Sequence, residues 1–118
     1  MFKKENKPVN WPAILKHSDD AELVYIKDQD TWDNDTDLHN FEYDVTDHLI
    51  DSSGIIFNLA HKENHYITPI PDGNVMELKY ILGLVKAHAA QSGSCCVAKL
   101  YAPSIPEAYK IVEFLNET

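Results

Sequence analysis

Arginine is absent from this chain of 118 residues, and all ten of its basic residues are lysines. A guanidinium group binds phosphate or carboxylate through two parallel hydrogen bonds, whereas lysine offers only a mobile point charge. The formal net charge is −9, so the chain also lacks the basic surface that phosphate binding requires. We therefore predict that neither nucleic acid nor an anionic membrane surface is a partner.

Long apolar segments and glycine-rich motifs are also missing. No run of about 18 apolar residues is present to form a transmembrane helix, and no apolar segment typical of a signal peptide follows the lysines near the start. The four glycines form no phosphate-binding loop, dinucleotide motif or nucleophile elbow. These absences predict a cytoplasmic protein without a bound cofactor.

Cysteine is equally scarce, and the two cysteines, Cys95 and Cys96, are neighbours in the sequence. Neighbouring Cα atoms lie about 3.8 Å apart, whereas an ordinary disulfide needs roughly 4.4–6.8 Å. We expect both thiols to be reduced, which agrees with a cytoplasmic location.

Negative charge is concentrated in one stretch of the chain. From Asp19 to Asp51 there are twelve acidic residues and one basic residue, Lys27, which gives a local charge of −11. The remainder has seven acidic residues and nine lysines, a charge of +2. This stretch could dock a basic protein partner, or it could serve solubility alone. The docking candidates are the acidic residues of its densest part together with a tryptophan suited to cation–π contact: Asp28, Asp30, Trp32, Asp33, Asp35 and Asp37.

Other patterns leave a metal-binding protein or a small enzyme open as alternatives. His61 and His65 flank a three-residue turn and could hold a metal such as zinc together with Glu63. Asp47 and His48 pair a carboxylate with an imidazole, as acid–base chemistry requires. The spacing of Asp33, Asp35 and Asp37 is that of a calcium loop, but Leu38 occupies the place where such a loop needs glycine. An accessory or binding protein that is not an enzyme remains the leading hypothesis.

Hydrophobic periodicity predicts an α+β fold. It consists of two layers, a mostly antiparallel sheet of about five to six strands with two helices from the C-terminal half packed on one face. The first helix is expected to follow a cap at Asn74 and the second a cap at Ser104, and a crossover through the first helix would place one parallel pair in the sheet. Residues 28–40 are expected to form a loop with one helical turn at most. The expected strands are 13–16, 22–27, 41–45, 48–51, 55–59, 66–68 and 95–101.

Three segments carry a resemblance to a known family. They are Asn10-Trp11-Pro12-Ala13-Ile14-Leu15, then Asp47-His48-Leu49-Ile50-Asp51-Ser52-Ser53-Gly54, and His88-Ala89 followed by residues 93–99. In these segments the chain resembles an uncharacterised family of small gammaproteobacterial proteins, a domain of unknown function. The resemblance implies a bacterial, cytoplasmic protein and carries no activity. Residues 1–10 are predicted to form a flexible polar tail before a single domain, residues 11–118.

Overall fold

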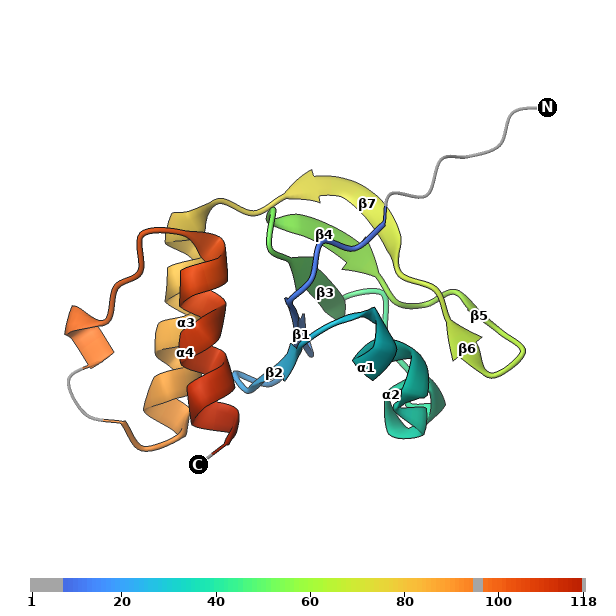
Figure 1. Cartoon of the computed structure of the whole chain (residues 1–118), viewed down its shortest axis with the longest axis horizontal. Coiled ribbons are helices and arrows are strands. Elements are labelled where there is room, and N and C mark those ends of the chain that lie inside the picture. The colour runs from blue at the N-terminus through green and yellow to red at the C-terminus, as the bar shows by residue number, and fades with distance from the viewer. Residues whose placement is uncertain (1–7, 95–96, 118) are drawn as a thin grey trace.

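A five-stranded antiparallel sheet forms the centre of the molecule (Figure 1). The computed structural model describes residues 8–94 and 97–117. The strand order is β2-β1-β3-β4-β7. The bounds of these strands are Ala13–Lys16 for β1, Leu23–Ile26 for β2, His48–Asp51 for β3, Ile55–Asn58 for β4 and Ile70–Val75 for β7. A separate hairpin pairs β5 (Lys62–Glu63) with β6 (Tyr66–Ile67).

Four helices cover the two faces of this sheet (Figure 1). The long helices α3 (Leu78–Gln91) and α4 (Ile105–Asn116) lie side by side on one face. The short helices α1 (Gln29–Asn34) and α2 (Thr36–Asn40) lie on the other side together with the small hairpin. A 3-10 turn, η1 (Val97–Lys99), lies between α3 and α4 in the sequence. The α+β class and the two C-terminal helices on one face are confirmed.

Alternation along the strands divides the core into two clusters. Successive side chains of a strand point to opposite faces of the sheet, so Ile14 packs under α3 and α4 while Leu15 packs on the opposite side. The first cluster also contains the fully buried Tyr109 of α4, whose hydroxyl donates to the carbonyls of Ile50 and Asp51 at 3.0 and 3.2 Å. The second cluster is centred on Trp32, which has no exposed surface.

The acidic segment 28–40 forms two short helices, where the sequence predicted a loop with one helical turn at most. Asp28 caps α1 by accepting from the backbone amide and hydroxyl of Thr31, both at 2.8 Å, and Asp35 caps α2 by accepting from the amide of Asp37 at 3.1 Å. Aspartate disfavours a helix interior but favours the position before the first turn. The prediction considered the first effect and missed the second.

Two predicted strands differ from the structure, and one observed strand of the five-stranded sheet was not predicted. Residues 41–45 form an irregular segment, since Phe41 and Val45 are exposed and their alternation with polar residues buries no face. Residues 70–75 lie outside the expected strands but form the edge strand β7, where the missing amide hydrogen of Pro71 is tolerated. Residues 97–99 form η1 rather than part of a strand, and Cys95 and Cys96 lie outside the described residues.

Pairing in the sheet also corrects two expectations. Every strand pair of the described sheets is antiparallel, so the predicted parallel pair was wrong. Helix α3 is capped at Glu77 rather than Asn74, because β7 continues to Val75, which pairs with Ile55. The pairing of β7 with β4 therefore outweighs the preference of Asn74 for a helix N-cap.

Two of the three segments that carry the family resemblance meet at the β3–β4 turn. The buried carboxylate of Asp51 accepts from the amides of Asn10, Ser53 and Ile55 at 2.9, 2.9 and 3.0 Å. The amide of Ser52 donates back to the carbonyl of Asn10 at 2.9 Å, and the Ser52 hydroxyl donates to the carbonyl of Pro12. This network joins the chain before β1 to the turn after β3, so these residues have a structural role.

Candidate functional site

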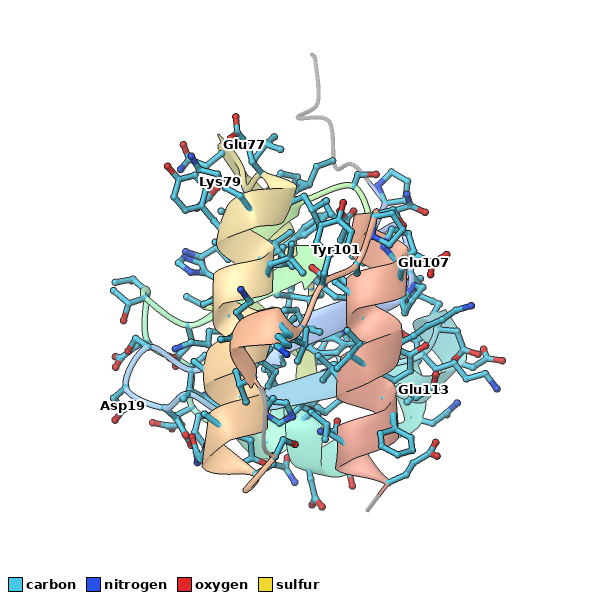
Figure 2. The ribbon with its side chains drawn as sticks, turned by 90° about the vertical axis from the view of Figure 1, so that its left-hand side faces the viewer. Asp19, Glu77, Lys79, Tyr101, Glu107 and Glu113 are labelled. Atoms are coloured by element: carbon cyan, nitrogen blue, oxygen red, sulfur yellow. The ribbon has the colours of Figure 1, made fainter. Side chains whose placement is uncertain are left out.

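An acidic groove lies between the β1–β2 turn and the irregular segment that precedes β3. Its volume is about 430 Å³, and six carboxylates line it together with His17, Ser18, Val24 and Phe41. We call these carboxylates the groove acids: Asp19, Asp20, Glu22, Glu42, Asp44 and Asp47. Asp19 stands on the β1–β2 turn (Figure 2). The fold thus brings together acidic residues that are separated by up to 28 positions in the sequence.

One wall of the groove is aromatic. The rings of His17, Phe41 and Tyr43 lie against one another, with centroid distances of 4.7 Å for His17–Phe41 and 5.7 Å for His17–Tyr43. Burial, reinforced by the nearby Asp47, raises the pKa of Tyr43 to about 12, so its hydroxyl stays protonated and donates to the carbonyl of Leu38. The ring of Phe41 is 48% exposed. An exposed aromatic ring beside carboxylates suits a cationic group.

Asp47 joins the two sides of the groove. Its carboxylate accepts from the amide of Ser18 in the β1–β2 turn and from the amide of Asp44, each at 2.8 Å. Burial alone would raise the pKa of Asp47, but these two amides and the nearby His17 outweigh that effect and hold the pKa below its ordinary value. The carboxylate is therefore charged at neutral pH and fixed in position.

Acidification is expected to loosen this junction. Because the folded pKa of Asp47 is lowered, its contribution to stability is complete above the ordinary value of 3.8 and is lost as the pH falls through the lowered value. Replacing Asp47→Asn should lower stability at pH 7 and flatten the dependence of stability on pH below about pH 4. Urea denaturation at a series of pH values checks this, and an unchanged pH slope in the variant would contradict it.

Lysine side chains do not neutralise the groove acids within the described residues. The ion pairs closer than 4 Å there all involve histidine, and the pair in the groove joins His17 Nδ1 to Asp47 Oδ2 at 3.8 Å. Lys16, the nearest lysine in the sequence, directs its ammonium group to the carbonyl of His17 at 2.6 Å. The groove therefore keeps a concentrated negative charge that is open to a cationic ligand.

The docking candidates chosen from sequence lie on α1, α2 and their caps rather than in the groove. Asp28 and Asp35 are the helix caps, and Asp33 accepts from the hydroxyl of Tyr66 at 2.6 Å. Asp30 and Asp37 are exposed in the first turns of the two helices. Trp32 is fully buried, and its indole Nε1 donates to the carbonyl of Ile67. Its ring belongs to the core, so it is unsuited to a surface contact.

The histidine candidates are not brought together with further ligands. His61 lies 3.8 Å from Glu63 on the exposed β5–β6 hairpin, and His65 is part of its turn with a φ of 62°. Asp47 faces His17, whereas His48 lies 3.9 Å from Asp72, so these sequence neighbours point to different partners. Within residues 8–94 and 97–117, no three His, Cys, Asp or Glu side chains are grouped to hold a metal ion.

Sequence reasoning located the acidic stretch but chose its densest part, and so it missed the groove acids. These residues come from both ends of the stretch, and only the fold brings the ends together. The turn chemistry of residues 17–20 and the spacing of Asp44 and Asp47 were the available signals, because aspartate side chains in turns bond to nearby amides. The exposed Phe41 carried no sequence signal of its own.

The fold and the groove define a small α+β domain with a central five-stranded antiparallel sheet and an acidic groove beside the β1–β2 turn. The family DUF4144, described as a protein structure with unknown function, matches residues 11–112. The chain belongs to this family. It is also similar to a solved structure, the NMR structure of the protein from Shewanella amazonensis, with a TM-score of 0.66 and 27% sequence identity over 99% of this chain and 97% of that chain. A search of the curated proteins found no match.

Proposed function

We propose that this protein is a small accessory protein, not an enzyme, and that it docks a basic protein partner in the acidic groove. The observation that carries the proposal is the set of six groove acids around a cavity of about 430 Å³ with the exposed ring of Phe41 in its wall. A lysine or arginine side chain of the partner would enter between the carboxylates and pack on that ring. The groove acids replace the candidates chosen from sequence as the main contact.

Long-range attraction would accelerate docking. A concentrated negative surface steers a positive partner and increases the association rate, and salt screens this effect beyond about 8 Å at physiological ionic strength. The acidic residues on α1 and α2 (Asp28, Asp30, Asp33, Asp35 and Asp37) would add to this field without contacting the partner. Binding should therefore weaken as salt increases.

The cellular setting is part of the same proposal. We place the protein in the cytoplasm of a gammaproteobacterium, on the basis of the sequence argument for reduced cysteines and the Shewanella relative. Among the described residues, no helix has both the length and the apolar character needed to span a bilayer.

Two triple variants with the same change in charge test the groove directly. The first is Asp19→Asn/Glu42→Gln/Asp44→Asn, in the groove, and the matched control is Asp30→Asn/Asp37→Asn/Glu63→Gln, at exposed positions outside it. The probe is a lysine-rich peptide of about ten residues, with binding measured by NMR titration at about 20 mM salt and again at about 0.5 M. Both variants should keep the wild-type fold, because all six residues are exposed.

The groove variant is expected to bind the peptide about tenfold more weakly, since three exposed charge contacts contribute roughly 0.2–1 kcal/mol each. The affinity of the control variant for the peptide should fall about twofold or less, because its charges act only at long range. The amide signals of His17 and Phe41 should shift on binding. Equal losses in the two variants, or shifts spread over the whole surface, would overturn the groove as the docking site and favour a role in solubility alone.

A further inference from the structure

The edge strand β2 is attached to the helical layer through side chains of α3 and α4. His88 of α3 accepts the amide hydrogen of Leu23 on its Nδ1 at 3.1 Å. Asn116 of α4 accepts from the amide of Tyr25 at 2.8 Å and donates to the carbonyl of Leu23 at 3.1 Å. In Figure 2 the two helices stand side by side in front of the strands. Three hydrogen bonds thus replace the neighbouring strand that β2 lacks on this side.

His88 fits this position only as a neutral imidazole. Its Nδ1 must carry a lone pair in order to accept from Leu23, so the ring proton lies on Nε2. The amide nitrogen of Asn116 lies 3.5 Å from Nε2 and donates to the carbonyl of Leu23, so in this tautomer it forms no hydrogen bond with the ring. A protonated ring would place an N–H group against the amide of Leu23 and break that hydrogen bond. His88 is also 97% buried, since only 3% of its surface is exposed.

We propose that His88 is a pH-sensitive latch, which holds β2 against α3 and α4 above neutral pH and releases the strand when the ring takes up a proton. Solvent reaches the latch through a cavity of about 470 Å³ lined by residues that include Glu22, His88 and Asn116. Glu22 and Val24 line this cavity and the acidic groove alike. Release of the latch would therefore change the wall of the groove. The latch rests on the contacts of His88 and holds whether or not the groove docks a partner.

The charged surroundings of His88 support the direction of the switch. Burial lowers the pKa of His88, and the negative charge of Glu22 opposes this only in part. The other charged residues on the elements packed around it are Lys79 and Lys86 of α3, Lys99 of η1, and Glu107, Lys110 and Glu113 of α4, with Glu117 at the C-cap of α4. Because the pKa is lower in the latched state than in the open state, the latch is fully stable above the ordinary value of 6.5 and weakens as the pH falls below it.

Hydrogen exchange of the full chain tests the latch. The readout is the opening of the Leu23 and Tyr25 amides, followed by NMR between about pH 7.5 and 5.5 and corrected for the intrinsic pH dependence of exchange. The opening equilibrium constant of these amides should increase up to about tenfold as the pH falls over this range. At one pH unit below its pKa, a released imidazole is protonated in about ten of eleven molecules. Wild-type opening that stays constant over this range would overturn the proposal.

A pair of matched variants assigns the effect to His88. In His88→Asn the side-chain oxygen replaces Nδ1 as the acceptor and cannot titrate, so its opening should be independent of pH. His61→Asn makes the same change at an exposed site and should keep the wild-type response. A full response in His88→Asn overturns the latch. If that variant does not fold, the ring signals of the wild type decide: a His88 midpoint at or above about 6.5 overturns the latch, and a lower one supports it.

Discussion

The variant Gly54→Ala is expected to lose about 3–4 kcal/mol of unfolding free energy, the largest effect we predict for a single methyl group. Gly54 ends the β3–β4 turn with a φ of +86°, a region that costs an L-residue about 1–2 kcal/mol. A Cβ atom there would collide with the backbone carbonyl oxygen of Met76, and Ile105 Cδ1 and Val75 Cγ1 would also be in close contact. The collision involves backbone, so no side-chain rotation relieves it.

The backbone of Met76 lies this close to Gly54 because the two residues are hydrogen-bonded at the C-terminal end of β7. Its carbonyl accepts the amide hydrogen of Met76 at 2.7 Å, and its own amide donates to the carbonyl of Asp51 at 2.9 Å. Moving the Met76 backbone away would break the first of these bonds and disturb the start of α3. Denaturant unfolding with linear extrapolation measures the loss of stability.

Gly73→Ala is the matched control for this variant. Gly73 has a similar φ of +91°, but an added Cβ would meet nothing within 4 Å. Only the backbone strain should remain, so the expected loss is about 1–2 kcal/mol. The difference between the two variants isolates the collision with Met76. Equal losses would show that backbone strain alone accounts for Gly54.

Asp51→Ala is expected to lower stability by about 3 kcal/mol, because it removes the acceptor of three backbone amides at once. Asp51 has no exposed surface, and the amides of Asn10, Ser53 and Ile55 all bond to its carboxylate. Alanine leaves these three donors without their partner. The same denaturation experiment measures the change.

The control for this prediction is an exposed aspartate. Asp37→Ala removes a carboxylate from the surface of α2 and should cost about 0.5 kcal/mol or less. Asp51→Asn should fall between the two, since its amide oxygen can still accept from Ser53 and Ile55. A loss for Asp51→Ala that is no larger than the loss for Asp37→Ala would contradict the structural role of the turn network.

The sequence was most informative where short-range patterns and tertiary pairing agree. The hairpin of β3 and β4 followed from two apolar runs around a glycine-containing turn, and the cap of α4 followed from Ser104 and Glu107, whose amide donates to the Ser104 hydroxyl at 3.3 Å. Both features depend on residues a few positions apart. Local chemistry therefore sufficed to predict them.

Features that depend on residues far apart in the sequence could not be predicted from sequence patterns. A helix that followed a cap at Asn74 would include Val75, but Val75 pairs with Ile55 in the sheet and is 65% exposed. His88 gave no sign that its ring would accept from a strand 65 positions away. The groove was missed for the same reason, because its two sides are joined by tertiary contacts, namely the hydrogen bond from Ser18 to Asp47 and the packing of His17 on Phe41.

The cover that His88 and Asn116 provide over β2 has a consequence for self-association. A sheet with two unpaired edge strands can add strands of other molecules on both sides and so grow without limit. Here the amide and carbonyl of Leu23 and the amide of Tyr25 are already hydrogen-bonded, and β7 forms the opposite edge of the sheet. If two molecules paired through their β7 strands, the free edge of each five-stranded sheet would be covered. Addition of strands to the five-stranded sheet would therefore stop at a pair of molecules.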